Sequence, residues 1–135
     1  MPDIVIDTNV LVAALKSSRG LSYRLLALVG SDRFRIHVSI PLVVEYEAVL
    51  KRMGLALSAA EIDDVIDFLC AKATGHEIFY LWRPMLKDPD DDFLLELAVT
   101  AAASIVTWNI DDFRRAKSLG IQAITPREFL ASLED

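Results

Sequence analysis

Hydrophobic and polar residues along this chain fall into short blocks that are typical of strands and helices in alternation. Residues 4–6 (Ile-Val-Ile) form an unbroken β-branched block, typical of a strand buried on both faces at the centre of a parallel sheet. The polar residues 7–9 (Asp-Thr-Asn) end this block, and apolar residues then recur at helical spacing from Val10 to Leu15. We therefore expect residues 7–9 to form a strand-to-helix turn at the carboxyl edge of the sheet, where open α/β sheets bind ligands.

The rest of the chain continues this alternation of helical and extended patterns. It predicts a single domain, residues 1–135, of the α/β class: a three-layer α/β/α sandwich with a mostly parallel central sheet. Strands are predicted over residues 4–6, 35–38, 77–80, 104–107 and 121–124, and helices over residues 9–17, 23–29, 41–53, 58–73, 91–102 and 111–118, with a last helix opened by Pro126.

Local signals refine the helix over residues 58–73. Ser58 and Glu61 have the spacing of a capping box, so the helix is expected to begin at Ser58. Gly75 is expected to end it. Cys70, which has no partner for an internal disulfide, falls on the apolar stripe of this helix, and we expect it to pack in the core.

The composition indicates what class of protein this is and where in the cell we expect it. At 135 residues and 53% hydrophobic content, the chain is long and apolar enough to bury a substantial core. No apolar run approaches the ~20 residues that a membrane span needs. The first ten residues contain no Lys or Arg, so no signal peptide is predicted. We expect a soluble, cytoplasmic protein without membrane association.

The balance of charge is acidic, and its distribution is uneven. The net charge of −6, from 20 acidic and 14 basic residues, argues against a general nucleic-acid binder. One run, residues 88–92 (Asp-Pro-Asp-Asp-Asp), is too dense in carboxylates for ordinary surface decoration. Cations bound at such a run make the effective charge facing a substrate much less negative.

Acidic residues also occur where the predicted elements can bring them together. Asp7 and the turn over residues 109–112 follow two strands, whereas Glu45 and Asp91 lie on or at the start of two helices. Carboxylates about 5 Å apart at an effective dielectric constant near 20 repel by roughly 3 kcal/mol per pair, so such a cluster needs a cation or shared protons. Hard oxygen ligands favour Mg²⁺ or Mn²⁺ over zinc. Such ions hold phosphates and activate water, which points to phosphodiester hydrolysis.

Four motifs in order along the chain closely resemble the PIN domain family. They are Ile-Val-Ile-Asp7-Thr8-Asn9, then Glu45 on the helix after Ser-Ile-Pro, then residues 88–91 leading into Leu-Glu-Leu-Ala, and Ile-Val-Thr-Trp-Asn109 with Asp112-Phe113. The resemblance covers nearly the whole chain. It is greatest to the PIN toxins of prokaryotic toxin–antitoxin systems, the metal-dependent ribonucleases related to VapC.

The resemblance assigns the first three acidic positions. It implies that Asp7, Glu45 and Asp91 are the principal metal-binding and catalytic acids. At the third position Asp91 is favoured because its spacing to the following strand resembles the family, but Asp88 or Asp92 can share its role.

The fourth position combines an amide with an acid. Many PIN domains carry Asp where this chain has Asn109, and VapC-like members pair Asn there with an acid three residues later, which matches Asp112. The resemblance therefore implies that Asn109 orients water or substrate and that Asp112 is the fourth catalytic and metal-binding acid, with Asp111 as the alternative. Thr8 and Thr107 are placed to hydrogen-bond the acids or metal-bound water.

Residues outside these motifs have weaker claims to function. Arg114, Arg115 and Lys117 follow the fourth site and can contact an RNA backbone, although charged runs on short helices are usually solvated faces. His37 and His76 are isolated in sequence and lack the spacing of metal ligands, so we expect structural roles for both.

The hypothesis from sequence is a Mg²⁺- or Mn²⁺-dependent endoribonuclease acting on single-stranded RNA, with a metal-bound water attacking the phosphorus in line. The family resemblance implies a small antitoxin protein as inhibitor and a homodimer. A non-catalytic PIN module that binds RNA or a protein is the alternative, and Asn109 keeps it open. A receiver-like signalling domain is disfavoured because Thr107-Trp108-Asn109 stands where its phosphate-binding Lys is expected.

Overall fold

A five-stranded parallel sheet forms the centre of the protein, and a computed structural model describes it over residues 1–77 and 92–134. The strands lie in the order β3-β2-β1-β4-β5, and every neighbouring pair is parallel. Their bounds are β1 Asp3–Ile6, β2 Arg35–Ser39, β3 Thr74–His76, β4 Ser104–Val106 and β5 Ala123–Ile124. All five strands therefore end at one edge of the sheet, and β1, which ends at Ile6, lies in the middle of it.

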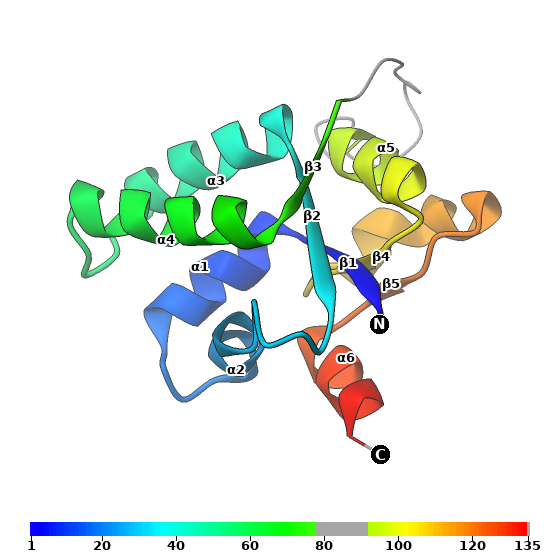
Figure 1. The fold of residues 1–135 in the computed structure, drawn as a ribbon, viewed down its shortest axis with the longest axis horizontal. Helices are drawn as coiled ribbons and strands as arrows, with labels where there is room; N and C mark the ends of the chain where they lie inside the picture. Colours follow the sequence, from blue (N-terminus) through cyan, green and yellow to red (C-terminus); the bar gives the residue numbers. More distant parts are fainter. Residues whose placement is uncertain (78–91, 135) are drawn as a thin grey trace.

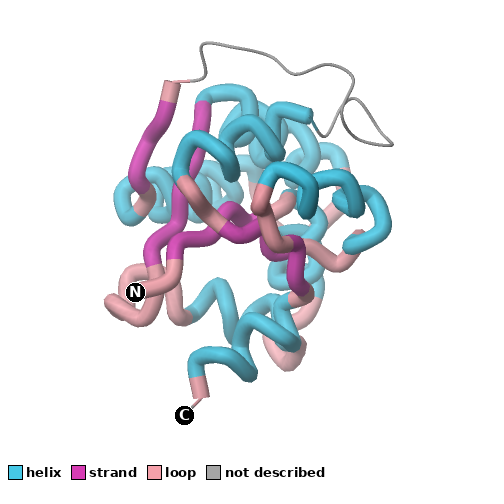
Figure 2. Tube along the Cα trace, turned by 90° about the vertical axis from the view of Figure 1, so that its right-hand side faces the viewer, coloured by secondary structure: helices cyan, strands magenta, loops and turns pink. Residues whose placement is uncertain are grey.

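Helices cover both faces of the sheet, which confirms the predicted α/β/α sandwich (Figure 1). One layer contains α1 Thr8–Lys16, α2 Leu21–Ala27, α3 Ile40–Arg52 and α4 Ala59–Lys72. The other contains α5 Asp92–Ala101 and the 3₁₀ helix η2 Ile110–Leu119, and α6 Pro126–Leu133 packs against α2. Figure 2 shows the strands twisting across the molecule between these layers.

Side-chain caps fix where several helices begin. Ser58 and Glu61 form the predicted capping box, with the Ser58 Oγ accepting the Glu61 N–H at 3.1 Å and the Glu61 carboxylate accepting the Ser58 N–H at 2.8 Å. Ser39, at the end of β2, accepts the N–H of Leu42 and so starts α3 directly at the carboxyl edge of the sheet. These caps place the first turns of the helices next to the strand ends.

The core is continuous from β1 outward to the helices of both layers. Ile4, Val5 and Ile6 are fully buried or nearly so, as their β-branched run predicts for a central strand. Tyr46 of α3 is buried above this strand, and its hydroxyl donates a hydrogen bond to the carbonyl oxygen of Ile6. The backbone immediately before Asp7 is therefore held by packing on both faces and by a buried polar contact.

Two local expectations from the sequence are wrong. Gly75 does not end α4: the helix ends at Lys72, and Gly75 lies inside β3, paired with Val38. Strand β3 thus precedes the predicted span, of which residues 78–80 lie outside the described residues. Cys70 is exposed, because it lies one residue beyond the inward-facing Leu69 and about 100° further round the helix.

The predicted loop and residues 88–91 of the acidic run lie in the part of the chain that the structure does not describe. Residues 78–91 include the predicted loop over 81–87, Asp88 and Asp91. In the described ranges on either side, none of the helices combines the length and the apolar character needed to cross a membrane.

Candidate active site

Asp7 is the centre of the candidate site, at the carboxyl end of β1. Its side chain is only 8% exposed. Its backbone N–H donates to the Val106 carbonyl at 3.0 Å, which continues the β1–β4 pairing. The Thr107 hydroxyl donates to Asp7 Oδ2 at 2.8 Å, and the Asn9 amide donates to the same oxygen at 3.1 Å. Asp7 is thus a buried carboxylate oriented by neighbours from two strand ends.

The environment of Asp7 makes its charge costly. The pKa of this carboxyl is raised from 3.8 to about 6, mainly by burial and to a smaller extent by the nearby charges of Glu45 and Asp112. Hydrogen bonds from the Thr107 hydroxyl and the Thr8 backbone N–H act in the opposite direction without cancelling the effect of burial. At neutral pH this carboxylate is therefore ionised in an environment that disfavours the charge.

Glu45 reaches the same region from α3. It is half-buried, and its Oε2 accepts a hydrogen bond of 2.5 Å from the Thr8 hydroxyl, at the start of α1. The pKa of the adjacent Tyr46 is raised well above 10, first by burial and then by the charges of Asp7 and Glu45. Both predicted threonine contacts are present: Thr8 orients Glu45 and Thr107 orients Asp7.

The turn after β4 supplies the fourth predicted position. The Asn109 N–H donates to the Thr107 hydroxyl at 3.0 Å, and the Asp112 N–H donates to the Asn109 carbonyl at 3.0 Å. Asp112 is half-buried and its charge acts on Asp7, whereas Asp111 is exposed and pairs with Arg114 at 3.0 Å. The structure therefore brings Asp112, and not Asp111, into electrostatic contact with Asp7. The Asn109 side chain is exposed and does not cap η2.

The third position is described only from Asp92 onward, because Asp88 and Asp91 lie outside the described residues. Asp92 is the first residue of α5 and is 1% exposed. Since α5 connects the parallel strands β3 and β4, it runs opposite to them and begins at the carboxyl edge of the sheet. The buried Asp92 carboxyl therefore belongs to the same end of the molecule as Asp7.

Glu96 is a buried acid that the sequence reasoning did not single out. It lies four residues after Asp92, on the same face of α5, and is also 1% exposed. Helix α5 packs against β1, which ends directly before Asp7, and against α3, which carries Glu45. The signal was present in the sequence: a carboxylate one helical turn after another acid, inside the apolar run Phe-Leu-Leu-Glu-Leu-Ala.

The groups gathered at this edge are hard oxygen donors. Asp7, Glu45 and Asp112 contribute carboxylates close enough for Glu45 and Asp112 to raise the pKa of Asp7, and the surrounding threonines contribute hydroxyls. This donor set suits Mg²⁺ or Mn²⁺. Over residues 1–77 and 92–134, no group of three or more His, Cys, Asp or Glu side chains is arranged to hold an ion on its own. Asp91 lies outside those ranges.

A second polar cluster lies at the opposite end of β1. Asp3 accepts hydrogen bonds from Arg35 at 2.9 Å and pairs with His37 Nε2 at 2.9 Å, and His37 Nδ1 lies 2.8 Å from His76 Nε2. The two histidines are therefore partners across β2 and β3, not the isolated residues that the sequence indicates. Hydrogen bonding with His37 and Arg35 holds the pKa of Asp3 below its usual value of 3.8.

A comparison with models of known protein families identifies the family of this chain. A family model described as the PIN domain matches residues 3–111, from the start of β1 to the turn that carries the fourth position. The chain belongs to the PIN domain family. The match spans Asp7 and Glu45, and it ends one residue before Asp112. Among curated protein sequences, none matches this PIN domain.

Solved structures have the same fold as this PIN domain. VapBC2 from Rickettsia felis, bound to a DNA fragment from its promoter, matches with a TM-score of 0.66 and 15% identity over 91% of this chain and 98% of the other. VapBC-1 from nontypeable Haemophilus influenzae matches with a TM-score of 0.62 and 14% identity, over 93% of this chain and 98% of the other. FitAcB from Neisseria gonorrhoeae matches with a TM-score of 0.59 and 11% identity, over 92% of this chain and 98% of the other. At these identities the likeness establishes the fold.

Proposed function

We propose that this PIN domain is a Mg²⁺- or Mn²⁺-dependent endoribonuclease that hydrolyses phosphodiester bonds of single-stranded RNA. The observation that carries the proposal is the position of Asp7: a buried carboxyl at the carboxyl edge of the sheet, with a pKa raised to about 6 by burial and by the charges of Glu45 and Asp112. Acids packed against each other in this way favour an external cation over a protein counter-charge.

Each acid has a distinct part in this proposal. Asp7, Glu45, Asp91 and Asp112 would hold the ion, with Asn109 orienting water or substrate. When bound, a divalent ion supplies charge neutralisation, phosphate binding and activation of water. Thr107 and Asn9 keep the Asp7 carboxylate in a single orientation, and Thr8 does the same for Glu45. This support favours ligands that are already in place before a substrate arrives.

The proposal extends to a biological role as the toxin of a toxin–antitoxin pair in the cytoplasm. The similar folds of VapBC and FitAcB support it, together with the sequence resemblance to VapC-like toxins. A small antitoxin protein would then inhibit the enzyme, and the active form would be a homodimer. Co-expression with the product of a neighbouring short reading frame, followed by co-purification, tests the inhibitor, and light scattering of the purified protein tests the dimer.

The direct test compares RNA cleavage by the native protein, Asp7→Asn, Glu45→Gln and Asp91→Asn in Mn²⁺ and in EDTA. We expect each substitution at the acids to lower kcat by roughly a thousandfold, because ion binding contributes several kcal/mol to such reactions. Asp3→Asn is the matched control, since it neutralises an acid at the other end of the same strand. Cleavage that survives EDTA and the substitutions at Asp7 and Asp91 would rule out the proposed chemistry.

A non-catalytic PIN module that binds RNA or a protein partner is the second candidate. The exposed amide of Asn109, at a position where many PIN domains carry an acid, is the observation that favours it. Calorimetric titration with Mn²⁺ distinguishes the two. Site-specific binding that disappears in Asp7→Asn supports the nuclease, and the absence of binding at millimolar Mn²⁺ supports the module.

A further inference from the structure

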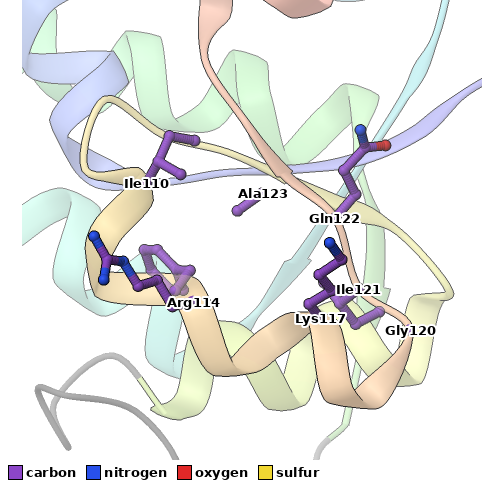
Figure 3. A pocket seen from close by; sticks show the side chains of 8 residues that line it. Ile110, Arg114, Lys117, Gly120, Ile121, Gln122 and Ala123 are labelled. Carbon is purple, nitrogen blue, oxygen red and sulfur yellow. The ribbon is translucent and has the colours of Figure 1, made fainter.

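A groove beside the candidate active site has a composition that the acidic cluster does not explain. It has a volume of about 580 Å³ and lies between η2 and β5, the strand at the end of the sheet. Its walls are formed by the apolar side chains of Ile110, Phe113 and Ile121, and by Ala123 of β5. Figure 3 shows Lys117 of η2 and Ala123 of β5 at the open space between the two elements, with Arg114 nearer the end at which Ile110 lies.

Two cations lie on the helical side of this groove. Arg114 and Lys117 of η2 both line it and both are exposed. They are three residues apart in a 3₁₀ helix, which places them on one face and about 6 Å apart along the axis. In a protein with a net charge of −6, the groove combines apolar walls with a positive rim.

These cations can be redirected to a ligand at little cost. Arg114 pairs with Asp111, but both side chains are about three-quarters exposed, at 76% and 74%, and such ion pairs contribute little to stability. Lys117 takes part in no ion pair within the described part of the chain. A phosphate group arriving at the rim therefore displaces one weak contact.

Arg114 links the groove to the acidic turn that contains Asp112. This residue also lines a second cavity, of about 410 Å³, together with Asp111, Asp112 and Arg115. Ile110, at the other end of the groove wall, directly follows Asn109. Arg114 therefore borders both the cavity that Asp112 lines and the apolar groove.

We propose that the groove between η2 and β5 binds one nucleotide of single-stranded RNA next to the scissile phosphate, with the base against the apolar walls and the phosphates against Arg114 and Lys117. This assignment rests on the proposed nuclease function and deepens it. Single-stranded substrates expose both a base face and a phosphate, the two chemistries that the groove offers. Exposed Gln122 at its rim adds an amide that can hydrogen-bond a base edge.

The test measures binding of a short, fluorescently labelled single-stranded RNA in EDTA and its cleavage in Mn²⁺. Lys117→Ala should weaken binding about fivefold, the upper end for one exposed ion pair. It should also reduce the slope of log affinity against log salt by about 0.7, the value for one phosphate contact on a single strand. In cleavage, KM should rise while kcat stays unchanged. Lys16→Ala is the matched control, because Lys16 is an exposed lysine in the last turn of α1, as Lys117 is in η2.

A second variant tests the apolar half of the groove without changing charge. Ala123→Leu adds bulk to the groove wall from β5 and should weaken RNA binding at least as much as Lys117→Ala, with an unchanged melting temperature. If Lys117→Ala weakens binding and Ala123→Leu does not, the positive charges attract RNA without a nucleotide occupying the groove. Our assignment of the groove is then wrong.

The remaining outcomes separate this inference from the proposed function. If Asp7→Asn abolishes cleavage but Lys117→Ala behaves like Lys16→Ala, only the groove assignment fails. If cleavage ignores EDTA and Asp7→Asn, the metal chemistry fails, while RNA binding in EDTA still decides the groove. If polyglutamate shifts the amide NMR signals of Ile121 and Ala123 and the RNA does not, the groove accepts an acidic protein segment and our assignment is overturned.

Discussion

Two aspartates at the two ends of strand β1, Asp3 and Asp7, are in opposite electrostatic situations. Asp3, at the beginning of the strand, is paired with Arg35 and His37, and hydrogen bonding holds its pKa below 3.8. Asp7, at the end, is buried beside Glu45 and Asp112, and its pKa rises to about 6. Asp3 is the first residue of β1 and Asp7 directly follows its last residue, so the two differ chiefly in what surrounds them.

The two carboxylates differ in whether the described neighbours balance their charge. At Asp3 the protein supplies the Arg35 guanidinium and a hydrogen bond with His37, so ionisation stabilises the fold. At Asp7 the described neighbours are hydrogen-bond donors and further acids, so ionisation costs stability that an external cation can restore. Perturbed acids of the second kind are typical of functional sites.

The largest expected effect concerns stability without metal. The rise of the Asp7 pKa from 3.8 to about 6 corresponds to roughly 3 kcal/mol at neutral pH. Asp7→Asn should therefore raise the free energy of unfolding in EDTA at pH 7 by up to about this amount, measured by urea denaturation. Equal stability of the two proteins would mean that Asp7 is not strained by burial.

The same difference gives the two ends of β1 opposite pH dependences. The folded-state pKa of Asp7 is raised, so the native protein binds the proton more tightly, and stability should fall as pH rises from about 4 to about 6. The folded-state pKa of Asp3 is lowered, so its contribution is present above 3.8 and is lost as pH falls through the lower folded value. Urea denaturation midpoints measured in EDTA across this pH range should no longer fall between about pH 4 and 6 in Asp7→Asn. In Asp3→Asn they should still fall over that range.

Metal should reverse the penalty at Asp7 and leave Asp3 unaffected. Mn²⁺ at a hundred times its dissociation constant stabilises a protein by about 2.7 kcal/mol, so thermal melts should shift upward on adding Mn²⁺. The shift should vanish in Asp7→Asn and should weaken as the pH falls through about 6, because protons compete for the carboxylate. An equal shift in Asp7→Asn would place the ion elsewhere.

The smallest effect is expected at the other end of the strand. Asp3→Asn should lower the free energy of unfolding by about 1 kcal/mol, since it weakens charged hydrogen bonds that are partly exposed to solvent. RNA cleavage should remain at the native level. Chemical denaturation and initial rates measured on the same preparation check both statements, and a loss of cleavage here would remove the contrast between the two aspartates.

Features encoded in short stretches of sequence could be predicted. The β-branched run before Asp7, the Ser58–Glu61 capping box and the alternation of helices and strands depend on local patterns, and the structure contains them. The meeting of Asp7, Glu45 and Asp112 could be predicted because parallel strands end at one edge.

Features that depend on tertiary pairing could not be predicted in the same way. Strand β3 is only three residues long and has Gly75, a residue depleted in strands, at its centre, so it depends on pairing with β2. That pairing also brings His76 to His37, a contact invisible in the sequence. Glu96 could not be predicted as a site residue, because a single acid within an apolar helical run does not show from sequence whether it is buried.

The hydrogen bond from the buried Tyr46 hydroxyl to the Ile6 carbonyl ties the helix of Glu45 to the strand of Asp7. Two acids that repel each other are thus held on one rigid scaffold, and the repulsion cannot be relieved by letting the helix drift away. In the proposed metal enzyme, binding and release of the ion would then change the charge on a fixed backbone and would require no refolding. An inhibitor of the proposed nuclease would accordingly need only to cover these acids, and the fold would be unchanged after its release.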